Sequence, residues 1–334
     1  MTTRIRAASG APHARLMGIG DYRPSRVVTN DEICAHIDSS DAWIRERSGI
    51  VSRRFAGDGE SVVDMSVAAA GKALAQAGVA PDEVGCVLVA TVSHLYQTPS
   101  AATSVAHRLG ASQAAAFDVS AACAGFCHGV ALANDMVRGG SATYVVVVGV
   151  ERLSDITDPT DRSTAFIFGD GAGAVVVGPA DEPGIGPTVW GADGSQLDAI
   201  AQNYSWLEVR NLPDIEWATL RIHGQQVFRW AVWEMAPVAR KALEAAGVRP
   251  GDLDAFIPHQ ANMRITDAMI KALALPSHVP VARDIAESGN TSAASVPLAM
   301  ARMLETGQAK SGGLALLIGF GAGLSYAAQV VTLP

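Results

Sequence analysis

GDGAGAVVVG at residues 169–178 and GFGAGLSYAA at 319–328 are two glycine-rich segments, and each precedes or enters an apolar strand pattern. A second pair of segments matches in the same way, because DVSAACAGF at 118–126 and SGNTSAASV at 288–296 each open a helical pattern just after a strand. Two matched pairs in the same order favour a duplicated structural unit. The alternative is chance similarity between segments rich in glycine and alanine.

Short apolar runs rich in β-branched residues alternate with helical patterns along the chain. The runs, which are typical of strands covered on both faces, lie at 84–91, 143–150, 173–178, 253–257, 313–319 and 326–333. The helical patterns lie at 61–78, 98–109, 123–138, 223–247, 261–274 and 291–306. This alternation predicts an α/β protein with mainly parallel strand pairing. Because no linker rich in proline or serine separates the two halves, we expect them to share one core.

Composition and charge exclude several classes of protein. Of the 334 residues, 49% are hydrophobic and 17% are charged, so the chain can bury a large core and is not of the disordered class. A net charge of −8 without any basic run argues against nucleic acid as a partner. No apolar run reaches the roughly 18 to 20 residues of a membrane helix. We expect a cytoplasmic protein that makes no contact with a membrane and has a disordered start over residues 1–13.

The cysteines provide a candidate nucleophile. Four cysteines do not form a disulfide framework in a chain of this length, so at least one thiol is expected to be free. Cys123 is the candidate, since Ser120 can cap the helix that begins beside it. At a helix N-terminus, the dipole and the free N–H groups lower the thiol pKa below its usual value of about 8.5. The alternative is a buried cysteine that packs as a small apolar side chain. Cys127 has no second pair of ligands near it in the sequence, so no metal site is expected.

Two further candidates also stand where a strand is followed by a helix. His259, in PHQAN, follows the run at 253–257, where side chains line the crevice of an α/β protein. Its alternative role is that of a hydrogen-bonded core histidine. Asn290, in GNTSAAS, precedes another helical pattern and could simply cap that helix. A Cys, a His and an Asn at such junctions are compatible with papain-like hydrolysis or with acyl transfer. The CGSCW-type motif of papain-like enzymes is absent here.

Taken together, DVSAACAGF, FGDGAGA, PHQAN, GNTSAAS and GFGAGLS resemble the signature segments of β-ketoacyl-acyl carrier protein synthase III, with similarity to its actinobacterial members. The segment VTNDEICAHIDSSDAWIRERSGIVSRR is similar to the opening of that family. The matches run in the expected order from about residue 14 to residue 334. Classical thiolases, which need a second active-site cysteine, fit less well. Elongating synthases also fit less well, since they need a second histidine where this chain has Asn290.

The resemblance implies a duplicated thiolase fold, layered α-β-α-β-α, with two five-stranded mixed sheets. Residues 14–180 would form an N-terminal half that carries the nucleophile, and residues 181–334 a C-terminal half that carries the His and the Asn. The resemblance further implies a homodimer, and no cofactor, since acyl-coenzyme A is a substrate.

The implied reaction starts fatty acid synthesis by a decarboxylative condensation of an acyl-coenzyme A with malonyl-acyl carrier protein. Cys123 would attack the acyl-coenzyme A, and the backbone N–H groups of Cys123 and Ala322 would hold the oxyanion. His259 and Asn290 would then donate hydrogen bonds to the malonyl thioester carbonyl while carbon dioxide leaves. The family motif has Gly at the place of Ala322. Alanine retains the N–H group, so the difference concerns space alone.

The resemblance also assigns residues to the binding of coenzyme A. Trp43 would contact the adenine, three arginines would lie near the phosphates or the tunnel mouth, and two side chains would follow the pantetheine. The arginines are Arg47, Arg162 and Arg264, and the pantetheine residues are Phe228 and Asn262. Arginine suits phosphate because its fork matches the phosphate oxygens. The alternative is that the aromatic residues belong to the core and the arginines to the surface.

Thr98, in HLYQTPS, stands where some family members have a bulky Phe that a partner subunit inserts into the acyl pocket. The smaller side chain predicts room for primers that are branched or longer than acetyl. Three other functions remain open on the same fold. They are a starter-unit priming synthase or acyltransferase of a polyketide pathway, a thioester hydrolase, and a binding module that forms no acyl adduct.

Overall fold

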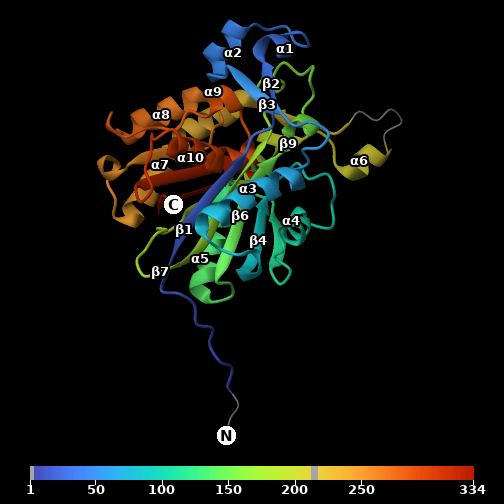
Figure 1. Cartoon of the computed structure of the whole chain (residues 1–334). Coiled ribbons are helices and arrows are strands. Elements are labelled where there is room, and N and C mark those ends of the chain that lie inside the picture. Colours follow the sequence, from blue (N-terminus) through green and yellow to red (C-terminus); the bar gives the residue numbers. More distant parts are fainter. Residues whose placement is uncertain (1–3, 212–216) are drawn as a thin grey trace.

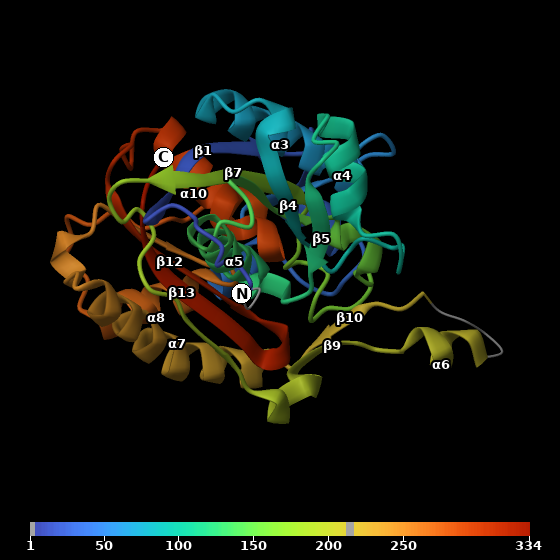
Figure 2. The ribbon, with the colours of Figure 1, turned by 90° about the horizontal axis from the view of Figure 1, so that it is seen from below.

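Six long helices organise the fold. They are α3 (Val62–Ala77), α4 (Ala101–Leu109), α5 (Gly125–Gly139), α7 (Gly224–Ala246), α8 (Met263–Leu273) and α10 (Ser295–Glu305). The computed structural model describes residues 4–211 and 217–334. Figure 2 shows five layers: α3 and α4, a first sheet, the central helices α5 and α10, a second sheet, and α7 with α8. The α-β-α-β-α layering expected from the sequence is therefore present.

The first sheet has five strands, β1 (His13–Tyr22), β7 (Gly171–Ala180), β6 (Tyr144–Glu151), β4 (Val84–Ala90) and β5 (Ala115–Val119), in that spatial order. The valines of β6 alternate between two cores. Val145 and Val147 pack in the cluster around α5 and α10, whereas Val146 and Val148 pack in the cluster formed with α3 and α4. Burial on both faces explains why this run is continuously apolar.

The second sheet has four strands, β11 (Ala255–Pro258), β12 (Leu314–Gly321), β13 (Ser325–Thr332) and β8 (Val189–Ala192), in that spatial order. The expectation of five strands is thus not met within the described residues. Val281 forms a single parallel bridge to Phe256 of β11, so the segment beside β11 is too short to be a strand.

Both sheets are mixed, as the family resemblance implies, and the mainly parallel pairing predicted from the alternation of strands and helices is wrong. β6 is parallel to β4 but antiparallel to β7. In the second sheet, β12 is parallel to β11 and antiparallel to β13. Strand β13 is in turn antiparallel to β8. Only a short turn separates β12 from β13, and such a turn can join only antiparallel neighbours. Strands β1, β5 and β8 were not predicted, because their sequences are not continuous apolar runs.

Smaller elements cover the ends of the layers. On one side lie β2 (Arg26–Thr29), α1 (Asn30–Cys34), α2 (Asp41–Ser48), β3 (Ser52–Phe55) and α9 (Ile285–Ser288), and on the other β9 (Ile200–Gln202), α6 (Trp206–Asn211) and β10 (Leu220–Ile222). In Figure 1, α1 and α2 cap the molecule above α9, and α6 projects from its body. The fully buried Arg53 donates to Asn30 Oδ1 and to the Phe166 carbonyl, both at 2.8 Å. It thereby ties this cap to the loop that leads into the site.

The two halves approach each other closely at the turns that precede α5 and α10. A Cβ atom at Gly319 of β12 would lie 2.9 Å from the carbonyl oxygen of Cys123, and one at Gly149 of β6 would lie 2.2 Å from that of Ala293. Only glycine permits such approaches. The turn of each half therefore rests on a central strand of the other half, and this brings Cys123 close to the segment that contains Asn290.

Residues 4–10, in the predicted disordered segment 1–13, form no helix or strand and are exposed. Residues 1–3 of the predicted disordered segment 1–13 lie outside the described residues. Strand β1 already begins at His13, and the Ala11 N–H donates to the Val137 carbonyl at 3.2 Å. Over residues 4–211 and 217–334, no helix is long and apolar enough to cross a membrane. Over the same residues, no group of three His, Cys, Asp or Glu side chains could hold a metal ion.

Candidate active site

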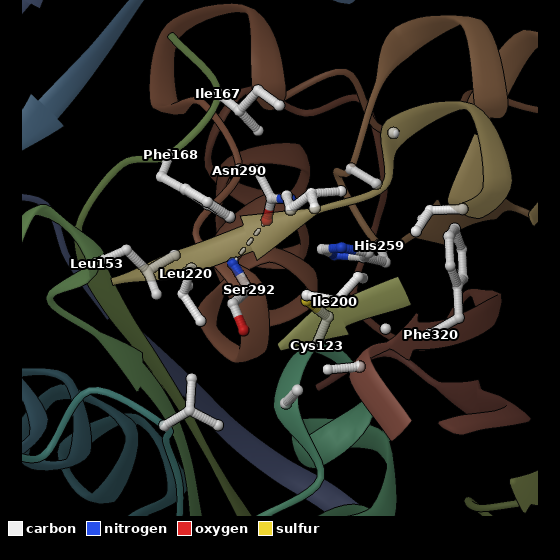
Figure 3. A pocket seen from close by; sticks show the side chains of 18 of the residues that line it. Cys123, Leu153, Ile167, Phe168, Ile200, Leu220, His259, Asn290, Ser292 and Phe320 are labelled. Atoms are coloured by element: carbon white, nitrogen blue, oxygen red, sulfur yellow. Dashed lines mark hydrogen bonds between the residues drawn. The ribbon is translucent and has the colours of Figure 1, made fainter. Parts of the chain in front are cut away.

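A cavity of about 380 Å³ lies between the turn before α5, the segment after β11 and the segment before α10. Cys123, His259, Asn290 and Ala322 all line it, as Figure 3 shows for the first three. Its walls are largely apolar and include Leu153, Ile156, Ile167, Phe168, Ile200, Leu220, Ile222, Val227, Phe228, Ile265 and Phe320. The structure therefore brings together the three side chains that the sequence predicts from separate segments.

Cys123 lies in the 3₁₀ turn Ala122–Ala124, directly before α5. Ala122 has a φ of 44°, a left-handed conformation that is rare for a residue with a side chain. This conformation turns the chain sharply beside the cavity, and Cys123 lines the cavity wall. The expected cap by Ser120 is wrong: α5 starts at Gly125, its N-cap is Ala124, and no side chain forms a capping hydrogen bond there. The intervening turn separates Ser120 from the first turn of the helix.

The predicted lowering of the Cys123 pKa is also wrong for the free protein. Burial among protein atoms raises the pKa of the Cys123 thiol to about 12, although hydrogen bonding from Ser292 lowers it and the charge of Glu151 raises it further. Loss of water around the sulfur outweighs the favourable position in front of α5, because the charged form loses the most hydration on burial. Cys123 thus rests as a thiol, and a nucleophilic attack requires an acceptor for its proton.

His259 is buried as a neutral ring. Its Nδ1 lies 2.7 Å from Ser295 Oγ, which also accepts from the Gln260 N–H at 3.4 Å. This contact engages Nδ1, so Nε2 is the ring nitrogen that remains available to a substrate in the cavity. Burial lowers the pKa of His259 to about 3, so the ring stays neutral near pH 7. Phe320 packs edge-on at 5.2 Å between ring centroids and fixes the ring plane.

Asn290 is oriented by its own turn rather than by the helix that follows. Its Oδ1 accepts from the Ser292 N–H at 2.8 Å, drawn as the dashed line in Figure 3, which leaves the amide NH₂ group as the donor on the other side. Its backbone N–H donates to the Ile167 carbonyl at 2.9 Å, and its own carbonyl accepts from Gly169 at 3.1 Å. Helix α10 has Ala294 as its N-cap, so Asn290 does not have the capping role that was its structural alternative.

The residues expected to bind coenzyme A fall into two groups. Phe228 and Asn262 line the cavity, and the Arg264 guanidinium lies 5.1 Å from the centre of the Phe228 ring. Trp43 lies outside the cavity lining, between Arg162 at 4.8 Å and Arg47 at 5.8 Å from its ring.

A hydrogen bond joins the two groups. The Asn262 side chain donates to the Arg47 carbonyl at 3.0 Å. Trp43 also meets Phe166 edge-on with ring centroids 5.3 Å apart. Thr98 is exposed and does not line the cavity of its own chain.

Three polar residues of the site were missed by the sequence analysis. Ser295 orients His259, Ser292 lies between Asn290 and Cys123, and Glu151 accepts from Ser292 Oγ at 3.0 Å. The two serines belong to the quoted segment GNTSAAS, where small polar residues suggest tight packing. Glu151 directly follows the valine-rich run at 143–150, and an acidic residue at the end of a buried strand is a signal that could have identified it.

The neutral state of His259 predicts a specific loss of stability in acid. The unfolded chain binds a proton on this residue below its ordinary pKa of 6.5, whereas the folded protein does not until about pH 3. We therefore expect the free energy of unfolding to fall by about 1.4 kcal/mol per pH unit through this window on account of His259. Urea unfolding of wild type and His259→Gln at several pH values measures it. The variant should lack this part of the slope, and equal slopes would contradict the assignment.

A thiol, a neutral imidazole and a carboxamide that line one apolar cavity, on a thiolase-like α/β fold, define the class of acyl-transferring condensing enzymes. Two family models narrow this class. The model for 3-oxoacyl-[acyl-carrier-protein] synthase III matches residues 117–194, and the model for the C-terminal part of that enzyme matches residues 243–333. The chain belongs to this β-ketoacyl-[acyl-carrier-protein] synthase III family.

Individual relatives agree with the family models over the full length. Beta-ketoacyl-[acyl-carrier-protein] synthase III 1 of Streptomyces coelicolor is 60% identical, over 99% of this chain and 100% of that protein. The crystal structure of the priming beta-ketosynthase from the R1128 polyketide biosynthetic pathway superposes with a TM-score of 0.96 at 48% identity, over 100% of this chain and 99% of that one. For the 3-oxoacyl-[acyl-carrier-protein] synthase III of Aquifex aeolicus, the TM-score is 0.88 at 37% identity, over 96% of this chain and 99% of that one.

Proposed function

We propose that the protein joins an acyl primer from acyl-coenzyme A to the two-carbon unit of malonyl-acyl carrier protein, with Cys123 as the covalent carrier. The products are β-ketoacyl-acyl carrier protein, coenzyme A and carbon dioxide, and the reaction initiates fatty acid synthesis. The observation that carries this proposal is the convergence of Cys123, His259 and Asn290 on one cavity. Intact-protein mass measurement after mixing with acyl-coenzyme A tests the first half-reaction, and product analysis with malonyl-acyl carrier protein tests the second.

In the first half-reaction, Cys123 Sγ attacks the thioester carbon and the coenzyme A thiolate leaves. The backbone N–H groups of Cys123 and Ala322 are the oxyanion donors in this proposal. Its support is that Gly321 brings the end of β12 against the nucleophile: a Cβ atom there would lie 2.8 Å from the Cys123 Cβ and 3.2 Å from its backbone nitrogen. Ala322 follows directly and lines the cavity.

In the second half-reaction, the malonyl carboxylate leaves as carbon dioxide and the remaining enolate attacks the Cys123 thioester. His259 Nε2–H and the Asn290 NH₂ group donate to the enolate oxygen. Both are neutral, which matters because a neutral donor stabilises the new negative charge without forming an ion pair with the departing carboxylate. Two such donors in a site shielded from water stabilise an enolate far more than they do in bulk solvent.

Coenzyme A would extend from the cavity past Phe228 and Asn262 to Trp43. Two guanidinium groups flank the half-buried Trp43 ring, so this corner offers a flat stacking surface with positive charge beside it. The adenine would stack on Trp43, and Arg47 and Arg162 would neutralise the phosphates. Arg264 at the tunnel mouth would serve the phosphates and the acidic carrier protein.

The primers that fit best are expected to be branched or longer than acetyl. The cavity of about 380 Å³ has mostly hydrocarbon walls that extend from Cys123 toward Leu153 and Ile156. Each methylene that is buried there contributes about 0.8 kcal/mol. We therefore expect kcat/KM for isobutyryl- or butyryl-coenzyme A to exceed that for acetyl-coenzyme A by roughly fourfold per added carbon until the pocket is full. A primer series with one carrier protein measures this, and a clear preference for acetyl would contradict it.

A starter-unit priming synthase of a polyketide pathway is the second candidate. The specific observation in its favour is the TM-score of 0.96 with the R1128 priming ketosynthase. The two functions use the same chemistry and differ in the carrier protein that delivers malonate. Competition between malonyl-loaded carrier proteins of the two kinds distinguishes them, with preference for the fatty acid carrier expected under the first proposal.

We also propose that the protein acts as a homodimer through the edge of the first sheet. Strand β5 is an edge strand, and Phe117 on it is 39% exposed. Leu95 and Tyr96, in the loop that carries Thr98, are 44% and 73% exposed. A second copy that pairs along β5 would cover these apolar side chains and bring Thr98 toward the partner's cavity. Neither a cofactor nor a metal enters the proposed reaction, and its soluble substrates suit the cytoplasm.

A further inference from the structure

Glu151 is a completely buried carboxyl group at the end of β6 for which the reaction as described has no use. Its ligands are four neutral donors. Oε2 accepts from Ser93 Oγ at 2.6 Å, from the Val92 N–H at 3.1 Å and from Thr91 Oγ1 at 3.2 Å, whereas Oε1 accepts from Ser292 Oγ alone at 3.0 Å. A buried carboxyl group without a cationic partner is costly. Its presence beside the nucleophile therefore needs an explanation.

The arrangement of donors determines where a proton would bind. Oε2 is saturated by three donors, so a proton taken up by Glu151 is placed on Oε1 and directed at Ser292 Oγ. Burial raises the pKa of Glu151 to about 7, against the opposing effect of its hydrogen bonds. The group can thus change its protonation state near neutral pH.

Ser292 connects Glu151 to the nucleophile. Its backbone is fixed in a left-handed conformation with a φ of 46°, and its N–H donates to Asn290 Oδ1 at 2.8 Å. Its hydroxyl donates to Glu151 Oε1 at 3.0 Å, and Ser292 lines the same cavity as Cys123. A serine hydroxyl can accept one proton while it donates another, so Ser292 can pass a proton between sulfur and carboxylate.

The other candidate acceptor for the thiol proton is unsuitable. His259 Nδ1 is engaged by Ser295 Oγ at 2.7 Å, and burial lowers the pKa of the ring to about 3, so His259 is a weak acceptor for the thiol proton. Among the charged and titratable neighbours of Glu151, Arg152 is paired with Asp155 at 3.1 Å, and Cys123 is the group whose pKa Glu151 raises. Glu151, which Ser292 connects to the cavity, is therefore the acceptor that the site offers.

We propose that Glu151 takes up the Cys123 proton through Ser292 during acylation, stores it while the acyl-enzyme exists, and returns it to the sulfur after condensation. This inference rests on the proposed function. As the Sγ–C bond forms, the S–H proton moves to Ser292 Oγ, and the Ser292 proton moves to Glu151 Oε1. The departing coenzyme A thiolate takes its own proton from solvent. When the enolate attacks, the Cys123 thiolate leaves and recovers the stored proton by the reverse transfer, so each cycle ends with thiol and carboxylate.

The stored proton also serves the second half-reaction. Glu151 is neutral while the enolate forms, so no buried negative charge opposes the one that develops beside His259 and Asn290. The same transfer that activates the nucleophile therefore prepares the site for decarboxylation.

Glu151→Gln tests the proposal with little change of shape. The Gln carbonyl can keep the three donors of Oε2, and its NH₂ group can donate to Ser292 Oγ, but it cannot take up a proton. With butyryl-coenzyme A as the probe and intact-mass detection of the adduct in quenched single turnovers, wild-type acylation should rise with pH to a plateau above about pH 7. In E151Q, acylation should be on the order of a hundredfold slower and lack this midpoint. Decarboxylation of malonyl-acyl carrier protein should be reduced far less.

Two further variants keep the test decisive. Ser93→Ala removes the 2.6 Å donor to Glu151, destabilises the carboxylate and should shift the acylation midpoint to higher pH. Ser292→Ala should slow acylation as E151Q does, and the double variant should be no slower than the slower single one. The proposed proton relay from Cys123 through Ser292 to Glu151 would be overturned if E151Q were acylated at the wild-type rate with the wild-type pH midpoint. An unshifted midpoint in S93A would also overturn it. Absence of any adduct in wild type would instead remove the proposed function itself.

Discussion

Replacing Cys123 by serine is expected to abolish the acyl adduct and to lower condensation by on the order of 10⁴-fold or more. A serine hydroxyl is a much weaker acid than a thiol, and the relay offers only a carboxylate with a pKa of about 7 to remove its proton. An oxygen ester is also a less reactive acyl donor than a thioester. Intact-protein mass spectrometry after incubation with butyryl-coenzyme A measures the adduct, and product analysis with malonyl-acyl carrier protein measures condensation.

Cys127→Ser is the matched control, because Cys127 lies one helical turn further along and is buried away from the cavity. This variant should acquire the adduct at Cys123 as wild type does, even if its free energy of unfolding is lower. An adduct on the C123S protein, or an adduct lost only in C127S, would contradict the assignment of the nucleophile.

Removal of either enolate donor is expected to slow condensation by about a hundredfold or more, while acylation of Cys123 continues. A single donor of this kind contributes about 3 to 4 kcal/mol to the transition state. Asn290→Asp is the sharper change, because one carboxylate oxygen keeps the 2.8 Å contact to the Ser292 N–H while the other replaces a donor by an acceptor. His259→Ala removes the Nε2 donor. Rates of malonyl-acyl carrier protein consumption and of adduct formation, measured separately, identify the affected step.

His128→Ala is the control for the histidine, since His128 hydrogen bonds the Ala124 carbonyl at 3.0 Å and stacks on Trp190 without lining the cavity. It should change condensation little. If N290D and H259A slowed acylation as much as condensation, the two residues would act on the first half-reaction, and their role as enolate donors would be wrong.

The three central side chains could be predicted because each stands at a local junction that the sequence itself displays. Cys123 and Asn290 lie in segments of small residues directly before a helical pattern, and His259 follows the apolar run at 253–257. These features do not depend on distant contacts. The same holds for the buried strand β6 and for helix α5, which ends before Gly140 with a φ of 78°. Their lengths follow from apolar patterning and from the glycine that ends the helix.

The protonation states could not be predicted, and the expectation for Cys123 had the wrong direction. A helix N-terminus is visible in the sequence, but the loss of water around the sulfur depends on atoms from β12 and from the turn before α10. Glu151 was missed for the same reason, because its four donors come from two segments that are more than fifty residues away in each direction.

By itself, the amino-acid sequence determined the order of the main helices and apolar strands and identified Cys123, His259 and Asn290 as candidate site residues. Only the tertiary structure decided that the second sheet has four strands, that His259 is buried against Ser295 and neutral, and that Glu151 hydrogen bonds with Ser292. The reason is physical. Backbone preferences and hydrophobic periodicity act over a few residues, whereas hydration, pKa values and hydrogen-bond direction depend on groups that meet only when distant segments pack together.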